Sequence, residues 1–169
     1  PNILKRTGEE TRFEELTQLS VDLAKEASKN YEALVAGAFP PIETSFRPDL
    51  TPNNEALSQF YSSIGSIMEG QADLIICETM SSIREGIEAA FTAKQYTDRV
   101  WLSWTTRGLN GEALPSGESL IDAVNAANEL NIECQLINCL AMDLVTAQID
   151  TLKLAGKFGV FANSCVLKN

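Results

Sequence analysis

The sequence predicts an α/β fold in which parallel strands alternate with helices. Short apolar runs that suit buried strands alternate with stretches of helical periodicity, and the pair recurs at roughly 30 to 40 residues, five times in all. Polar residues follow the strands where they end: Glu78 and Thr79, Ser103 and Thr105, Asn138 and Cys139, and Asn163 and Ser164. Two architectures fit this pattern, a doubly wound flavodoxin-like sheet and part of a (β/α)₈ barrel, because both collect functional groups at the carboxyl ends of strands.

The amino-terminal third predicts a helix and then a strand. Apolar residues recur at helical spacing over residues 9–28, and Thr7 and Glu10 have the spacing of a capping box before them. The apolar run 33–39 predicts a buried strand, which Pro40 and Pro41 would end because proline cannot continue a ladder.

The middle of the chain predicts two further units. Thr51 is expected to cap a helix whose first residue is Pro52 and which Gly70 ends. Residues 73–77 form the next apolar run, and Ser82 and Glu85 have capping-box spacing before the helix that follows. The remaining expected elements are strands over 100–105, 132–138 and 158–162, and helices that begin near Leu120 and Asp143.

Composition and charge exclude several classes of protein. The 169 residues include 13 Lys and Arg against 23 Asp and Glu, so the net charge of −10 argues against a nucleic-acid partner. The sequence contains no histidine, which excludes a Ser-His-Asp triad, a histidine base and a histidine metal ligand within it. No run approaches the length of a membrane span, and no G-x-G-x-x-G turn or P-loop follows a strand.

The four cysteines, Cys77, Cys134, Cys139 and Cys165, form no C-x-x-C pair, and we expect a reduced, cytoplasmic protein. Cys77 is expected in the core. Cys134 is expected there too, because strand alternation places it on the opposite face of the strand from Cys139. The chain begins at Pro1 without an initiator methionine, which suggests that it is not a whole gene product.

Two strand ends carry the strongest candidates for chemistry. Glu78 could hold a substrate ammonium, or it could pair with a lysine or arginine or face a helix N-terminus. Cys139 could be a thiolate ligand or nucleophile, or a small buried apolar residue. Ser103 and Thr105 could bind a carboxylate or amide, or they could be ordinary strand residues.

Six segments in this order resemble the homocysteine S-methyltransferase family, which includes betaine–homocysteine methyltransferases and the homocysteine domain of cobalamin-dependent methionine synthase. The segments cover nearly the whole chain: 35–41 (VAGAFPP), 72–79 (ADLIICET), 101–105 (WLSWT), 114–117 (LPSG), 137–139 (INC) and 161–164 (FANS).

The resemblance implies a (β/α)₈ TIM barrel, of which residues 1–169 would form about five central βα units in a single, partial homocysteine-binding domain. The family binds Zn²⁺ through three cysteines, and Cys139 matches the one that follows an asparagine at a strand end. The other two stand in a Gly-Gly-Cys-Cys stretch that this sequence lacks. Glu78 matches the family's amine-binding glutamate, and Ser103, Thr105 and Asn138 would line the site. Cys165 departs from the family, which often has glycine there.

By this resemblance the function is zinc-dependent transfer of a methyl group to the thiol of homocysteine, giving methionine. The donor could be betaine, S-methylmethionine, S-adenosylmethionine, dimethylsulfoniopropionate or methylcobalamin, and a homo-oligomer is possible. The alternatives are a methyltransferase for another thiol or a selenol, a truncated or non-catalytic relative without zinc, and a flavodoxin-like binding module.

Overall fold

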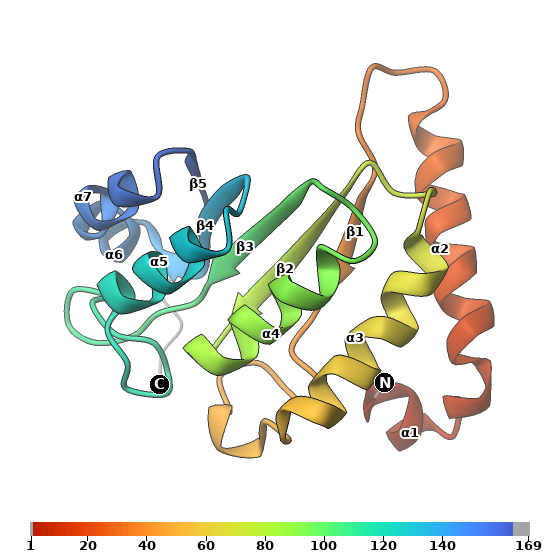
Figure 1. Ribbon diagram of the computed structural model, residues 1–169, viewed down its shortest axis with the longest axis horizontal. Helices are drawn as coiled ribbons and strands as arrows, with labels where there is room; N and C mark the ends of the chain where they lie inside the picture. The colour runs from red at the N-terminus through yellow and green to blue at the C-terminus, as the bar shows by residue number, and fades with distance from the viewer. Residues whose placement is uncertain (1, 164–169) are drawn as a thin grey trace.

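The computed structural model describes residues 2–163. It contains a sheet of five parallel strands: β1 (Ala36–Phe39), β2 (Leu74–Met80), β3 (Val100–Trp104), β4 (Cys134–Ala141) and β5 (Phe158–Asn163). Their order in the sheet is their order in the chain (Figure 1). A doubly wound sheet reverses its order at a switch point, whereas a barrel does not, so the order is that of a barrel segment. The sheet is open, with β1 and β5 as its edges.

Helices connect the strands and cover one face of the sheet (Figure 1). They are α1 (Asn2–Thr7), α2 (Phe13–Ser28), α3 (Asn54–Met68), α4 (Ile83–Ala93), α5 (Leu120–Glu129), α6 (Met142–Ala147) and α7 (Ile149–Leu152). Short 3₁₀ turns, η1 (Glu10–Arg12), η2 (Pro48–Leu50) and η3 (Lys153–Ala155), lie between them. A membrane-spanning helix is not found within residues 2–163.

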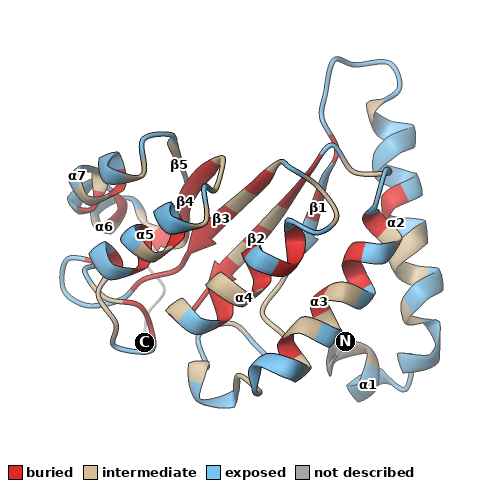
Figure 2. Cartoon of the chain, in the orientation of Figure 1, coloured by how far each residue is buried: buried red, intermediate tan, exposed pale blue. Residues whose placement is uncertain are grey.

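The core lies between the sheet and helices α3 to α5, where the central strands are buried (Figure 2). Phe39 of β1 stacks on Tyr61 of α3 with ring centroids 5.1 Å apart. The indole of Trp104 lies against Gly86 of α4, so closely that a Cβ at Gly86 would be 2.4 Å from the ring. This packing fixes which face of each strand points to the helices.

The opposite face of the sheet carries the polar candidates. Strand register places Ile76 beside Trp101 and Ser103 beside Leu136, so alternation puts Glu78, Ser103 and Asn138 on one face. Gln135 lies on the other face, where its amide donates to Val124 O and Asn128 Oδ1 of α5. In a closed barrel the face with Glu78 and Asn138 is the interior, and we call it the inner face.

The start of the first long helix differs from the prediction. The helix begins at Phe13, after a 3₁₀ turn, and not at Glu9. Thr7 is the last residue of α1, a helix that the sequence analysis did not predict, and its hydroxyl donates to Leu4 O. The proposed capping box of Thr7 and Glu10 is therefore wrong.

The cap of the second long helix also differs, because Asn53 and not Thr51 accepts the bond from Ala56 N. Ser82 caps α4 as predicted, but the Glu85 carboxylate does not complete the capping box. It instead accepts a hydrogen bond from Ile42 N in the loop after β1. Helix α6 starts after Ala141, which leaves Asp143 in its first turn and not at its cap.

Candidate functional site

Two irregular strand ends define the candidate site. The register shifts between Cys77 and Met80 in β2, and again between Asn138 and Ala141 in β4. Each shift contains a residue in the left-handed region, Thr79 with φ 60° and Cys139 with φ 58°. This conformation is rare for residues other than glycine, above all for a β-branched one. Bulges of this kind redirect a side chain, and they mark this end of the sheet as specialised.

A buried hydrogen-bond network joins the two strand ends. The Ser103 hydroxyl donates to Asn138 Oδ1 over 2.7 Å. Asn138 Nδ2 donates to Thr79 Oγ1 over 2.7 Å and to Cys139 Sγ over 3.2 Å. Ser103 and Asn138 are fully buried, so these bonds satisfy groups that cannot reach water. The structure thus brings three of the predicted site residues together: Ser103, Asn138 and Cys139.

Cys139 differs from the other described cysteines in its access to solvent. All three are free thiols, but Cys77 and Cys134 are buried and Cys139 is half-buried. Burial raises the pKa of the Cys77 and Cys134 thiols, so neither is suited to act as a thiolate. Both core predictions are confirmed. The alternation argument for Cys134 is wrong, however, because the bulge breaks the alternation before Cys139. Cys165 lies outside the described residues.

Glu78 lies on the inner face of β2, one residue before Thr79, and is half-buried. Among the residues that the structure describes, none forms an ion pair or hydrogen bond with its carboxylate. The alternative of a structural pair with a lysine or arginine is therefore not seen in this part of the chain. A partly buried carboxylate with free lone pairs can accept hydrogen bonds from an ammonium group.

Thr105 follows β3 and is fully buried. Its backbone N–H donates to Met80 O over 3.0 Å, which ties the end of β3 to the end of β2. Its hydroxyl has no hydrogen-bond partner within the described part of the chain. The structure does not join Thr105 to the network around Asn138.

The sequence analysis missed Glu85, a buried carboxyl group near the same end of the sheet. Its oxygens accept from Ile42 N and from Thr51 Oγ1, both over 3.3 Å, and so tie the loop after β1 to α4. Burial raises the pKa of this carboxyl above its usual range, and these two bonds oppose the shift. Its capping-box spacing to Ser82 predicted a bond within α4, and no local pattern indicated its bonds to Ile42 and Thr51.

Comparisons with known proteins identify the family. The family model described as homocysteine S-methyltransferase matches residues 2–169. The chain belongs to the homocysteine S-methyltransferase family. A comparison with curated proteins gives no match.

Solved structures of a homocysteine methyltransferase, MmuM from Escherichia coli, have the same fold. Its metallated form aligns with a TM-score of 0.79 at 26% identity, over 96% of this chain and 62% of that one. The oxidized form aligns with a TM-score of 0.77 at 26% identity, over 95% and 61%. The apo form aligns with a TM-score of 0.67 at 25% identity, over 92% and 62%. This chain therefore spans less than two thirds of the length of MmuM.

The resemblance to the family implies a zinc site built from three thiol ligands, and Cys139 is the described residue that the sequence analysis expects to belong to it. Cys139 fits, because this half-buried residue stands at a strand end and its sulfur already accepts a hydrogen bond from Asn138. Within residues 2–163, no three His, Cys, Asp or Glu side chains come close enough to hold a metal ion. The described residues thus offer one candidate ligand, Cys139, and no complete metal site.

Loops form a rim around this end of the sheet. Phe46 N donates to Ser81 Oγ and Ser116 N to Ser81 O, so the loops after β1 and β3 meet just beyond β2. A hollow of about 470 Å³ between them is lined by Arg47 and Arg107. Arg47 is already paired with Asp49, while Arg107 donates to Pro115 O. Cationic side chains thus lie at the rim of the site.

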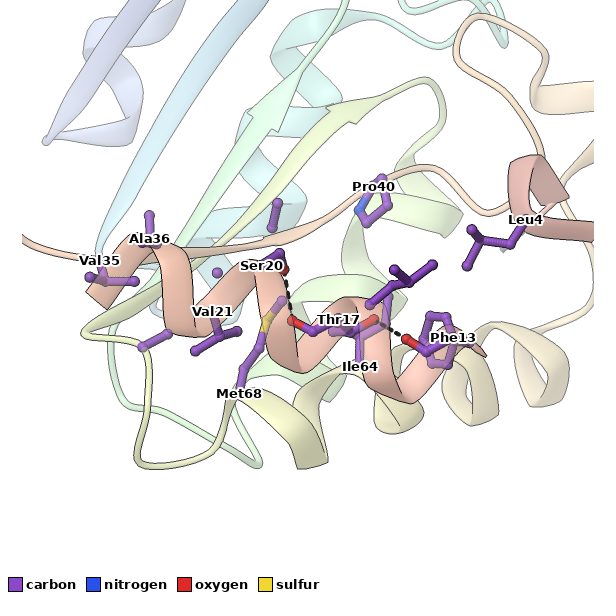
Figure 3. A pocket seen from close by; sticks show the side chains of 15 residues that line it. Leu4, Phe13, Thr17, Ser20, Val21, Val35, Ala36, Pro40, Ile64 and Met68 are labelled. Carbon is purple, nitrogen blue, oxygen red and sulfur yellow. Dashed lines mark hydrogen bonds between the residues drawn. The ribbon is translucent and has the colours of Figure 1, made fainter. Parts of the chain in front are cut away.

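A second hollow, of about 440 Å³, lies between α2, β1 and α3 (Figure 3). Apolar side chains such as Phe13, Ile64 and Met68 line it, and none of the lining residues that the structure describes carries a carboxylate or a thiol. Its two hydroxyls are engaged within α2, since Thr17 donates to Phe13 O and Ser20 to Thr17 O (Figure 3). Within residues 2–163, the lining of this hollow is therefore mainly apolar and contains none of the predicted site residues.

Proposed function

We propose that the intact protein containing this chain transfers a methyl group from a small donor to the thiol of homocysteine, giving methionine, with Zn²⁺ as cofactor. The observation that supports this most is the half-buried Cys139 thiol, held by Asn138 at the carboxyl end of a barrel-type sheet. Family membership supplies the reaction type, and the free thiols of the described cysteines suit a reducing, cytoplasmic setting.

Cys139 would be one ligand of the zinc, and the other ligands would come from outside residues 2–163. Bound zinc keeps a thiol deprotonated at neutral pH, which makes the sulfur of homocysteine nucleophilic without any histidine. This chain's contribution is to hold Cys139 Sγ in place through Asn138, 3.2 Å away.

Glu78 would bind the amino group of homocysteine, because its carboxylate lies on the same face of the sheet as Asn138 and has free lone pairs. Thr105 would offer its hydroxyl to the substrate, since this buried group has no partner in the described structure. Ser103 would act through Asn138, whose amide orientation its hydroxyl fixes.

The test is a Cys139→Ala variant of the intact protein, measured for zinc content and for methylation of homocysteine with each of the five donors. We expect loss of both zinc and turnover with no loss of fold, because the side chain is half-buried and small. Cys134→Ala on the same strand is the matched control, and it should keep zinc. Retention of zinc and rate by Cys139→Ala would disprove the assignment.

One observation favours a second candidate, a non-catalytic relative: residues 1–169 contain no Gly-Gly-Cys-Cys stretch, which holds the family's other two cysteines. Metal analysis of the intact wild-type protein separates the two, because about one zinc per chain supports the enzyme and none supports the relative. Parallel assays with other thiols and selenols would test the acceptor.

A further inference from the structure

We propose that Thr79 is a positioning residue for Cys139, whose hydroxyl gives the metal-binding sulfur a second hydrogen bond beside that from Asn138. The inference rests on the proposed function in so far as Cys139 is a zinc ligand. It concerns a residue that neither the family match nor the sequence analysis assigns to the site.

The direction of the hydrogen bonds leads to this role. Ser103 donates to Asn138 Oδ1, so the amide turns its Nδ2 toward Thr79 and Cys139. A metal-bound sulfur carries no proton, and the amide must therefore face it with a donor. Because Thr79 Oγ1 accepts from Asn138, its own proton is free for another acceptor. Cys139 Sγ lies 4.0 Å from it, at the limit for a hydrogen bond to sulfur.

The two strained backbones make this contact possible. Strands β2 and β4 are separated by β3, and alternate strands in a sheet lie about 9.5 Å apart. In two regular strands at that separation, the side chains at positions 79 and 139 would not meet. The left-handed conformations of Thr79 and Cys139 turn both side chains toward Asn138, which bonds to each of them. A β-branched residue at φ 60° costs conformational free energy, and we attribute this strain to the placement of the Thr79 hydroxyl beside Asn138 and Cys139.

The decisive variant is Thr79→Val in the intact protein, because valine keeps the shape and the β-branch and so changes the backbone strain little. Thr79→Ser restores the hydroxyl. The matched control is Thr92→Val in α4, where another buried threonine hydroxyl has no partner in the described structure. Zinc affinity is measured by chelator competition, and the thiolate-to-metal absorption band is recorded with Co²⁺ in place of zinc.

We expect Thr79→Val to weaken zinc binding about 10- to 100-fold, as loss of an outer-shell partner does, and to move the Co²⁺ band to lower energy. Thr79→Ser and Thr92→Val should match the wild type. Wild-type affinity and spectrum in Thr79→Val would overturn the inference, and so would a defect that serine does not repair. A wild-type protein without zinc or homocysteine methylation would instead overturn the proposed function, and this inference with it.

Discussion

The two ends of the sheet are built from different interactions. At the amino end, the residue directly before each of the last four strands is charged, with alternating sign: Asp73, Arg99, Glu133 and Lys157. Glu133 is the centre of this row, because Arg99 Nε lies 3.1 Å and Lys157 Nζ 2.9 Å from its oxygens. These two cations lower the pKa of the Glu133 carboxyl to about 2.

The carboxyl end instead joins its strands through the neutral, buried bonds of Asn138 and carries the strained residues Thr79 and Cys139. The comparison separates two tasks within one sheet. Charge pairs near water hold strands in register with little demand on geometry, whereas a metal-binding thiol, the role proposed for Cys139, needs a buried network that fixes one orientation. Barrel enzymes likewise carry their active sites at the carboxyl ends of the strands and residues that serve stability at the amino ends.

The sharpest test of this division compares two amides on β4. Asn138→Leu removes the three hydrogen bonds of the Asn138 amide. It leaves the Ser103 hydroxyl without its acceptor and the Thr79 hydroxyl without its donor, so we expect a loss of about 2 to 4 kcal/mol in unfolding free energy. Zinc binding and turnover should also be lost. Gln135→Leu, on the face toward the helices, leaves Trp104 Nε1 unpaired and should cost similar stability. It should leave zinc affinity unchanged, and equal effects on zinc would refute the division.

The role of Glu85 at the carboxyl end of the sheet can be tested by the pH dependence of stability. Burial raises its pKa in the folded protein above the unfolded value, so the folded state binds more protons between the two values. Wild-type stability should therefore fall as pH rises from the unfolded pKa to the folded one. Glu85→Gln should lack this decline in denaturant titrations across that range. Glu88→Gln on the same helix is the control, and it should keep the wild-type slope.

Glu133, at the amino end of the sheet, should change the pH dependence of stability in the opposite direction to Glu85, and its effect on the unfolding free energy should be the smallest of the three. Its folded pKa of about 2 lies below the unfolded value near 4.5, so its contribution is present above pH 4.5 and is lost as pH falls toward 2. Glu133→Gln should lower the unfolding free energy at neutral pH by about 1 kcal/mol or less, because its partners are exposed. The difference from wild type should shrink in 1 M salt, and an unchanged difference would argue against charge pairing.

Much of the sheet and part of the site could be predicted because they depend on local sequence. Apolar runs specify buried strands, and residues after strand ends must meet at one edge of a parallel sheet, which is why Ser103, Asn138 and Cys139 could be grouped. The extension of β2 to Met80 and of β4 to Ala141 could not be predicted. It depends on left-handed residues that tertiary contacts hold in place.

Competition between neighbouring polar residues explains other differences. Thr51 and Asn53 can both cap a helix, and the carboxylate of Glu85, distant in sequence, engages Thr51 and leaves Asn53 as the cap. Thr79 was seen only as a polar residue after a strand, because its partner Asn138 comes 59 positions later. No local pattern connects the two.

The agreement between strand order in space and strand order in the chain also bears on how the protein is made. As the chain leaves the ribosome amino end first, each new strand finds the edge of its neighbour already formed. Among the strands within residues 2–163, pairing then does not wait for a distant segment, which keeps contacts short in sequence and favours stepwise folding during synthesis. The network around Asn138 would form late, once β4 docks on β3, so the strained site closes only on a sheet that is already in place.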